Sequence, residues 1–506
     1  MAALPKDTAI AVIGTGTMGG GIAQVAAAAG HRVLLFDTDL DGPGRAVERI
    51  ADALERLVRK ARMTASTRAD LLTKLQPCTQ LRDLAPARLA VEAIVEDLEA
   101  KRELFTKLEK FLSEDAILGT NTSSLSVTAI AAKLARPERL VGMHFFNPVP
   151  RMGLVEVVSG LATAPAAART VFDTAAAWGK EPVHAKSTPG FIVNRVARPF
   201  YAEALRVLGE GGADAATLDA VMRESGKFRM GPFELMDLIG HDVNYAVTRS
   251  VFDAYFGDPR FTPSIIQQEL VLGGRLGRKS GRGFFDYTKS ATCPEPAAAE
   301  PAPAPSRVCA SGTPGLLEPL IASMADAGIA IDRDGEQSAE LLVDGAVGVS
   351  VTDGRCATER MAQENSAPLV VLDLALDYAS AGRVALAAAD QISADQAARA
   401  IGLFQALGKT VSMLDDVPGL IGMRTVCMLA NEAADAVNQG ICSAPDVETA
   451  MRRGVNYPLG PLTWAERIGV GRVVEVLDNL ARTYGEDRYR VSPLLRRAHY
   501  SGEKLS

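Results

Sequence analysis

Short apolar runs alternate with amphipathic segments over roughly the first third of the chain. The apolar runs cover residues 9–13, 33–36, 89–94, 117–119 and 140–145. Parallel strands that are joined by crossover helices produce this kind of alternation. The pattern therefore predicts an α/β domain over residues 1–186.

The spacing of apolar residues becomes mostly helical after about residue 185, from Phe191 to Val271. Apolar side chains that recur every three to four residues form one face of a helix. We therefore predict a separate all-α domain over residues 187–287.

A break in composition follows the helical region. Residues 294–306 read PEPAAAEPAPAPS, and such an Ala/Pro-rich stretch cannot bury a core. We expect a semi-rigid extended spacer there, inside a linker over residues 288–313. Apolar runs such as Pro368–Asp373 then return among helical patterns. They predict a small α/β unit over residues 314–410, without a glycine-rich phosphate loop.

An internal repeat links the two halves of the chain. Thr188–Arg195 (TPGFIVNR) aligns with Val417–Arg424 (VPGLIGMR), and Met230–Gly240 aligns with Leu459–Gly469, without gaps. In both pairs the residue numbers differ by the same amount, from 188 to 417 and from 230 to 459, and we call this difference the repeat offset. Two matched motifs at one offset are hard to obtain by chance. We therefore predict a second copy of the helical domain over residues 411–506.

The second copy differs from the first at informative positions. Asn194 corresponds to Met423, and no glycine-rich loop and no motif like NTSSL or HFFNP precedes the second copy. We therefore expect one active site per chain. Because an exposed apolar face needs a partner, we also expect the second helical copy to pack on the first and cover an apolar face.

A glycine-rich loop follows the first predicted strand and opens a helix. It comprises Gly14, Thr15, Gly16, Thr17, Met18 and Gly19. In this context the GxGxxG spacing is typical of a dinucleotide site, because the glycines allow a tight turn, approach of a pyrophosphate and close helix packing. Asp37 ends the second strand, where a carboxylate binds the ribose 2′-hydroxyl and repels a 2′-phosphate. The sequence therefore predicts a Rossmann fold that binds NAD rather than NADP.

Polar motifs lie where strands end or where the helical domain begins. They are Asn121–Leu125 (NTSSL), His144–Pro148 (HFFNP), Val155-Glu156 and Gly190–Asn194 (GFIVN). Ligands bind at the carboxyl ends of strands in an open α/β sheet. Oxidation of an alcohol with NAD needs a base, and His144 suits that task at neutral pH, with Glu156 to orient it. Ser123 and Asn194 could hold a substrate hydroxyl or carbonyl.

Composition narrows the function classes. The 506 residues include 54 Lys and Arg against 61 Asp and Glu, a formal net charge of −7, so no nucleic-acid partner is expected. The six cysteines form no C-x-x-C pair, which indicates neither a disulfide framework nor a metal site. Apart from residues 9–30, which contain the glycine-rich loop, no uninterrupted apolar run approaches the roughly 20 residues of a bilayer span. We expect no membrane partner and a reducing cytoplasmic location.

With these motifs, the first roughly 287 residues resemble the L-3-hydroxyacyl-CoA dehydrogenase family. The resemblance implies that His144 and Glu156 form the catalytic pair, and that Ser123 and Asn194 contact the substrate. It implies NAD contacts from Asp37, Glu96, Lys101, Ser123, Asn147 and Lys279. The family binds the CoA phosphates with a basic helix, and Lys60 aligns best with it. Ser123 is a further implied contact of the CoA substrate.

The longer architecture resembles that of bacterial enzymes of phenylacetate degradation within this family. That resemblance implies an acyl-CoA substrate, 3-hydroxyadipyl-CoA, which is oxidised to 3-oxoadipyl-CoA, and it leaves a homodimer open. The nearer alternative is the same chemistry on 3-hydroxybutyryl-CoA or a broad range of acyl chains, as in fatty acid β-oxidation. The farther alternative is a non-enzymatic NAD-binding scaffold. Candidates to read a terminal carboxylate are Arg195, Arg198 and Arg229.

Overall fold

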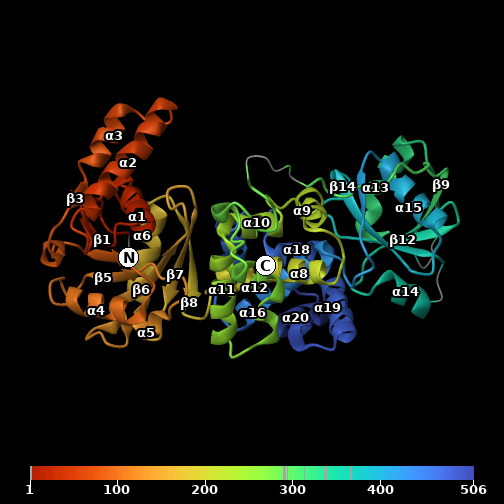
Figure 1. The fold of residues 1–506 in the computed structure, drawn as a ribbon. Helices are drawn as coiled ribbons and strands as arrows, with labels where there is room; N and C mark the ends of the chain where they lie inside the picture. The colour runs from red at the N-terminus through yellow and green to blue at the C-terminus, as the bar shows by residue number, and fades with distance from the viewer. Residues whose placement is uncertain are drawn as a thin grey trace. The chain divides into compact units, whose positions relative to one another are not determined.

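The computed structural model describes residues 3–288, 292, 294–312, 314–334, 339–364 and 367–505. Its contacts divide the chain into two compact units. The first comprises Met1–Arg195 and Gln439–Val455, and the second comprises Val196–Asn438 and Asn456–Ser506. A short piece of the second helical copy therefore belongs to the first unit. Figure 1 labels many of the elements of each unit.

The first unit contains a sheet in the order β3-β2-β1-β4-β5-β6-β7-β8. The strands are β1 Ala9–Ile13, β2 Arg32–Phe36, β3 Leu75–Pro77, β4 Leu89–Glu92, β5 Ile117–Thr120, β6 Leu140–Phe145, β7 Leu154–Ser159 and β8 Glu181–Lys186. All neighbours are parallel except β6 and β7. The sequence located five of these strands, whereas β3, β7 and β8 were not anticipated.

Helices cover both faces of this sheet. They are α1 Thr17–Ala28, α2 Gly42–Arg59, α3 Ala65–Leu72, α4 Leu98–Leu108, α5 Val127–Ala131, α6 Pro165–Ala177, α7 Val193–Val196 and α17 Ala444–Gly454. Every residue of β1, β4, β5 and β6 is buried, as expected for central strands with helices on both sides. The predicted Rossmann-like α/β domain is confirmed.

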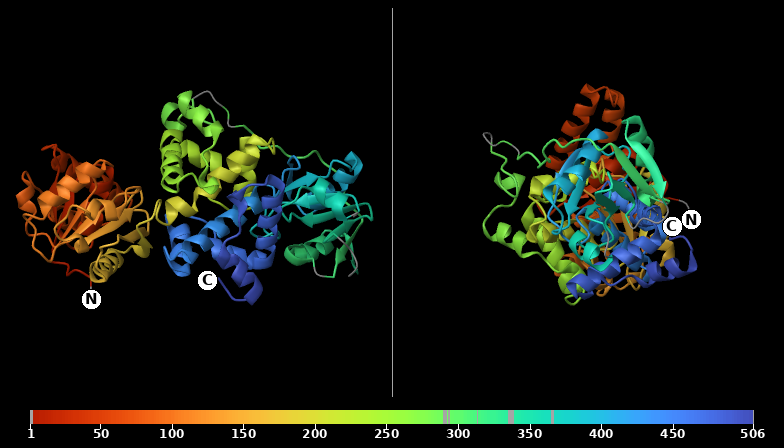
Figure 2. Two further views of the ribbon diagram at one scale, coloured as in Figure 1. Left: turned by 90° about the horizontal axis from the view of Figure 1, so that it is seen from below. Right: turned by 90° about the vertical axis from the view of Figure 1, so that its right-hand side faces the viewer.

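The second unit contains the two helical copies. The first copy has α8 Arg198–Gly209, α9 Ala215–Glu224, α10 Pro232–Ile239, α11 His241–Ala254 and α12 Ile265–Leu272. The second copy contributes α16 Gly422–Asn438, α18 Pro461–Ile468, α19 Val470–Tyr484 and α20 Pro493–Ser501. Helices α10 and α18 begin and end at equivalent positions of the repeat, so the repeat found in the sequence is a repeat of structure. Figure 2 shows the helices of the two copies against one another.

A second sheet follows the linker, in the order β10-β9-β11-β12-β13-β14-β15. Its strands are β9 Arg307–Ser311, β10 Ala330–Asp334, β11 Leu341–Val343, β12 Val347–Val351, β13 Leu369–Leu372, β14 Arg383–Ala388 and β15 Thr410–Met413. Its helices are α13 Glu318–Asp326, α14 Ala357–Glu364 and α15 Ala394–Ala406. The 3₁₀ helices of both units are η1 Leu81–Leu84, η2 Pro137–Arg139, η3 Pro259–Phe261, η4 Arg278–Ser280, η5 Gly315–Leu317 and η6 Asp487–Tyr489.

The predicted linker, residues 288–313, needs two corrections. Strand β9 lies inside it and pairs with β10 and β11, so the folded α/β unit begins earlier than its composition indicated. The Ala/Pro-rich stretch is also hydrogen-bonded to other segments of the second unit, to which it belongs. Ala297 N donates to Thr217 Oγ1 at 2.8 Å, and Ala302 N donates to Gln405 Oε1 at 2.8 Å. Backbone hydrogen bonds, which composition does not encode, fix the extended stretch in place.

Helices α8 and α16 bring the two helical copies together around a buried ion network. Glu203 is 0% exposed and accepts from Arg424 Nε at 2.8 Å, Arg488 Nη2 at 2.7 Å and Tyr489 Oη at 3.0 Å. We expected an apolar face here, and the contact is instead partly ionic. Burial alone would raise the pKa of Glu203, but the charges of Arg488 and Arg424 lower it to about 2.

Replacing Glu203 with glutamine should destabilise the second unit, because the buried guanidinium group of Arg488 loses its counter-charge and that of Arg424 is left with Glu210. We expect the free energy of unfolding at pH 7 to fall by about 3–5 kcal/mol. The pKa of Glu203 is lower in the folded state than in the unfolded state. Its stabilisation is therefore complete above about pH 4.5 and is lost as the pH falls towards about 2.

Urea unfolding of both proteins at pH 7 and pH 3 measures the effect. The difference in free energy of unfolding between the wild type and Glu203→Gln should be smaller at pH 3 than at pH 7. Glu486→Gln is the matched control, because Glu486 pairs with Arg206 at a largely exposed position and such pairs contribute about 0–1 kcal/mol. Equal stability of wild type and Glu203→Gln at pH 7 would contradict the interpretation.

Among the described residues, no helix is long and apolar enough to cross a membrane.

Candidate active site

The glycine-rich loop has the backbone geometry that a pyrophosphate site requires. Gly14 has φ +87°, and a Cβ atom there would lie 2.5 Å from Ala93 O. A Cβ atom on Gly19 would lie 1.8 Å from Gly14 O, whereas one on Gly16 would meet nothing within 4 Å. Gly16 therefore leaves open space at the beginning of α1, where uncapped N–H groups favour an anion. The loop fits the diphosphate of a dinucleotide.

A cavity of about 650 Å³ opens beside this loop. Its lining includes Gly14, Gly16, Asp37, Ile94, Val95 and Leu104. The volume and the mixture of apolar walls with a few charged groups, Asp37 among them, are typical of a cofactor site. The dinucleotide site predicted from the sequence is therefore a real cavity in the first unit, at the carboxyl ends of β1 and β2.

Asp37 is anchored to the glycine-rich loop. Its Oδ2 accepts from Thr15 N at 2.6 Å and from Thr15 Oγ1 at 2.8 Å. Burial raises the pKa of Asp37, but the hydrogen bonds from Thr15 outweigh it and the net shift is downward. The carboxylate is therefore ionised at neutral pH and lines the cavity, where a ribose hydroxyl can donate to it.

Replacing Asp37 with serine should raise the KM for NAD by roughly 10–100-fold, because a charge-assisted hydrogen bond contributes about 1.5–3 kcal/mol. The preference for NAD over NADP should weaken at the same time, since the repulsion of a 2′-phosphate is removed. Initial rates with each cofactor measure both effects. Asp39→Asn is the control, because Asp39 is exposed and pairs with Arg45. Unchanged cofactor discrimination in Asp37→Ser would rule out this role.

His144 and Glu156 face each other across the one antiparallel strand pair of the first sheet. The register of β6 and β7 places the two residues opposite one another, where side chains of neighbouring strands meet. His144 Nδ1 lies 2.6 Å from Glu156 Oε2, and the two residues are 5% and 0% exposed. Because a carboxylate only accepts, Nδ1 carries the proton and Nε2 is left to accept one.

Glu156 also fixes the segment that carries Asn194. Its Oε1 accepts from Ile192 N and Val193 N, both at 2.9 Å, at the beginning of α7. Asn194 Nδ2 donates to Ser123 O at 3.4 Å. One carboxylate therefore orients the base and positions the amide. The sequence did not reveal the backbone contacts of Ile192 and Val193.

Two aromatic rings form an apolar wall beside the base. The ring of Phe146 lies 4.5 Å from the His144 ring, and the ring of Phe191 lies 5.8 Å from it. Phe191 was not among the predicted site residues, although it lies inside the GFIVN motif. An apolar wall limits water near the imidazole and strengthens its interaction with Glu156.

Glu96 organises the turn that contains Ser123. Its Oε1 accepts from Thr122 Oγ1 at 2.6 Å, Ser123 N at 2.9 Å and Ser124 Oγ at 2.9 Å. Burial raises the pKa of Glu96, but the hydrogen bond from Thr122 and the charge of Lys101 lower it overall. The repeated hydroxyl residues of the NTSSL motif were the sequence signal for this cluster. Among these hydroxyls, only that of Ser123 was predicted to belong to the site.

Lys101 lies behind Glu96 as a buried cation. It is 1% exposed, and its Nζ lies 2.9 Å from Glu92 Oε2 and 3.3 Å from Glu96 Oε2. Asn147 is exposed after β6, and Lys60 is exposed at the end of α2. Lys279 belongs to the second unit, where its Nζ lies 2.5 Å from Asp242 Oδ1. The structure thus brings Glu96, Lys101 and Ser123 together, and it describes Lys279 in a different unit.

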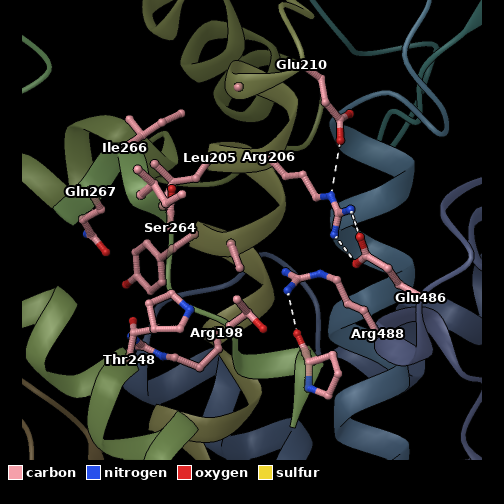
Figure 3. A pocket seen from close by; sticks show the side chains of 17 residues that line it. Arg198, Leu205, Arg206, Glu210, Thr248, Ser264, Ile266, Gln267, Glu486 and Arg488 are labelled. Atoms are coloured by element: carbon pink, nitrogen blue, oxygen red, sulfur yellow. Dashed lines mark hydrogen bonds and ion pairs between the residues drawn. The ribbon is translucent and has the colours of Figure 1, made fainter. Parts of the chain in front are cut away.

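The three arginine candidates for a terminal carboxylate have different surroundings. Arg195 is 2% exposed and donates from Nη1 to Gln439 Oε1 at 2.9 Å. Arg198 lines a cavity of about 420 Å³ within the second unit and donates from Nη1 to Thr248 Oγ1 at 3.1 Å (Figure 3). Arg229 is exposed. Arg195 belongs to the first unit, whereas Arg198 and Arg229 belong to the second.

The second half carries a degenerate version of this site. At the repeat offset, Asp373 stands in place of His144 and Ala385 in place of Glu156. Asp373 accepts from Gly422 N at 2.7 Å and Met423 N at 2.9 Å, which are the counterparts of Val193 and Asn194. Burial raises the pKa of Asp373 to about 6. A carboxylate still binds the backbone at the beginning of the helix, but it stands at the position of the base and not at that of Glu156, and the imidazole base and the amide are lost.

Family models cover most of the chain. The NAD-binding domain of 3-hydroxyacyl-CoA dehydrogenase matches residues 9–188, and the C-terminal domain of the same family matches residues 190–287 and again 419–504. A reduced Rossmann-fold domain of 3-hydroxybutyryl-CoA dehydrogenase matches residues 349–418.

Individual relatives agree with these domains. A 3-hydroxyadipyl-CoA dehydrogenase of Escherichia coli is 45% identical over 96% of both chains. A 3-hydroxybutyryl-CoA dehydrogenase of Clostridioides difficile is 40% identical over 55% of this chain and 99% of its own. Among solved structures, a 3-hydroxybutyryl-CoA dehydrogenase of Escherichia coli has a TM-score of 0.89 and 43% identity, and covers 98% of this chain and 99% of its own.

Proposed function

Since the chain belongs to the 3-hydroxyacyl-CoA dehydrogenase family and is an NAD-dependent enzyme of that family, we propose that it oxidises 3-hydroxyadipyl-CoA to 3-oxoadipyl-CoA. The observation that carries the chemistry is the buried contact of 2.6 Å between His144 Nδ1 and Glu156 Oε2. The observation that favours the adipyl substrate is the identity of 45% over 96% of both chains with the Escherichia coli enzyme of that name.

The base works through its second nitrogen. The C3 hydroxyl of the substrate gives its proton to His144 Nε2 as the C3–O bond gains double-bond character. NAD, which the glycine-rich loop and Asp37 would hold, would supply the acceptor for the hydride of C3. The imidazolium that forms is stabilised by Glu156, which is held ready by two backbone N–H groups and needs no rearrangement.

Ser123 and Asn194 position the reacting group. Asn194 Nδ2 already lies within 3.4 Å of Ser123 O, so the amide and the hydroxyl-bearing turn form one wall of the site. A side-chain amide and a hydroxyl can both donate to the developing carbonyl oxygen. The turn is kept in place by Glu96 and, behind it, by Lys101. We assign Asn147 and Lys279 to cofactor binding, and Lys60 to the CoA phosphates.

The substrate proposal is tested by initial rates of NADH formation with three acyl-CoA thioesters. They are 3-hydroxyadipyl-CoA, 3-hydroxyhexanoyl-CoA, which has the same chain length but no terminal carboxylate, and 3-hydroxybutyryl-CoA. The adipyl proposal predicts the highest kcat/KM for the dicarboxylate. An equal or higher kcat/KM with the C4 substrate would reject this proposal and assign the enzyme to short-chain acyl metabolism, in line with the names of other relatives.

The location that we propose is the cytoplasm. Among the described residues, Cys78, Cys356, Cys427 and Cys442 are free thiols. Free thiols are typical of proteins in reducing compartments. For the assembly we propose either a monomer or a homodimer, which the elution volume in size-exclusion chromatography with light scattering would distinguish.

A further inference from the structure

A segment of the second helical copy lies against the sheet that carries the catalytic pair. Helix α17 packs on β7 and β8 within the first unit. Lys186 N donates to Ile441 O at 2.9 Å, and His184 N donates to Asp446 Oδ1 at 3.3 Å. The edge strand β8 is therefore covered by residues that come much later in the sequence.

The same segment contacts both neighbours of Asn194. A Cβ atom on Gly454 would lie 2.7 Å from Leu154 Cδ2 and 3.0 Å from Val193 Cγ2, so the helix backbone packs tightly there. At the other end of the segment, Gln439 Oε1 accepts from Arg195 Nη1 at 2.9 Å. Val193 and Arg195 flank Asn194, and Val193 N is also a donor to Glu156.

This docking occurs twice in the chain, at positions related by the repeat offset. In the second unit, α9 packs on β14 (Figure 1). Asp415 N donates to Gly212 O at 2.9 Å, as Lys186 N does to Ile441 O. Arg424 Nη1 donates to Glu210 Oε2 at 2.9 Å, as Arg195 does to Gln439. Each helical copy thus sends its corresponding helix onto the sheet of the other copy.

Only one of the two docking sites adjoins catalytic groups. Ser225 stands where Gly454 stands in the other copy, and its Oγ donates to Arg383 O at 2.7 Å. The sheet beneath it carries Asp373 and Ala385 in place of the base and its orienter. The backbone of α19 also packs closely on this second α/β unit, since a Cβ atom on Gly354 would lie 2.6 Å from Val476 O.

We infer that residues 439–455 of the second helical copy position the active site of the first copy, with Gly454 and Gln439 as positioning residues. The inference rests on the proposed dehydrogenase chemistry. Gly454 sets the position of Val193, and Gln439 sets that of Arg195, so Asn194 is held from both sides. A misplacement of about 1 Å can cost about 100-fold in rate. The second helical copy therefore supports the active site of the first half, although the second half lacks the base and the amide of an active site.

The test compares Gly454→Val with Ser225→Val in the full chain. Both variants add bulk at the same place of the repeated docking, but only Gly454 lies beside Val193. We expect Gly454→Val to lower kcat at least 10-fold, with the dissociation constant of NADH within about 2-fold of wild type. Ser225→Val should keep kcat within about 2-fold. Equal losses of kcat in the two variants, or no loss in Gly454→Val, would overturn the inference.

A second pair of variants tests the other contact if Gly454→Val fails to fold. Gln439→Met keeps the length of the side chain but removes the amide oxygen, and should lower kcat several-fold. Gln439→Glu recreates the Arg424–Glu210 pair of the other half and should restore kcat. A Gln439→Glu variant that does not restore kcat, or a Gln439→Met variant with the kcat of the wild type, would contradict the inference. A wild type without dehydrogenase activity would instead reject the proposed function.

Discussion

Glu156→Gln is expected to lower kcat about 10²–10⁴-fold while the protein stays folded and binds NADH normally. The amide that replaces the carboxylate can donate its N–H to Nδ1 of His144, so the ring proton moves to Nε2. In that tautomer Nε2 cannot accept the proton of the substrate. The imidazolium that would form also loses the negative charge that stabilises it.

The remaining oxygen of the new amide can still accept from Ile192 N and Val193 N, which explains why the fold should survive. The melting temperature and the dissociation constant of NADH check this point. Glu114→Gln is the control, because Glu114 is exposed and pairs with Arg136 away from the catalytic pair, so its loss should leave kcat unchanged. A Glu156→Gln variant with kcat within about 3-fold of wild type would remove this carboxylate from the mechanism.

His144→Ala is expected to lower kcat about 10²–10⁴-fold, which is the usual contribution of a general acid–base group. No other described imidazole takes its place opposite Glu156 in the register of β6 and β7. The residual rate should rise with pH, because hydroxide or water must then remove the hydroxyl proton. Rates of NADH formation between pH 6 and pH 10 measure both the loss of kcat and the rise of the residual rate with pH.

His499→Ala controls for the loss of a histidine elsewhere, since His499 is exposed on α20. It should behave like the wild type at every pH. If His144→Ala kept a kcat near that of the wild type at every pH, another group would have to be the base.

The parts of the fold that the sequence predicted are those that local patterns encode. The glycine-rich loop is local, because its turn and the packing of Gly19 on Gly14 involve residues of the loop itself. The central strands are continuous apolar runs, since they are buried on both faces. The two helical copies were found because two motifs kept a single offset.

The parts that were missed depend on pairing between distant segments. Strands β7 and β8 lie at the edge of the first sheet, and the exposed residues of β8 weaken its apolar pattern. The register that sets His144 opposite Glu156 is a property of an antiparallel pair within a mostly parallel sheet. The docking of α17 on β7 joins segments from opposite halves of the chain, for which no local signal exists.

One feature of the second half was accessible from the sequence. The repeat offset also aligns β6 with β13 and β7 with β14, although their sequences have diverged. Following that offset upstream of residue 417 identifies Asp373 and Ala385 as the residues that replaced the base and its orienter. Asp373 is buried and accepts from two backbone N–H groups at the beginning of α16, which indicates a structural role for the remnant of the site.

The central claim is that one chain carries one working site, built in the first half and supported by the second. Calorimetric titration of the full chain with NADH tests it most directly, because the stoichiometry counts competent dinucleotide sites. One NADH bound per chain is the predicted result. Two NADH bound per chain would show that the second α/β unit binds the cofactor without a glycine-rich loop, and would contradict the claim.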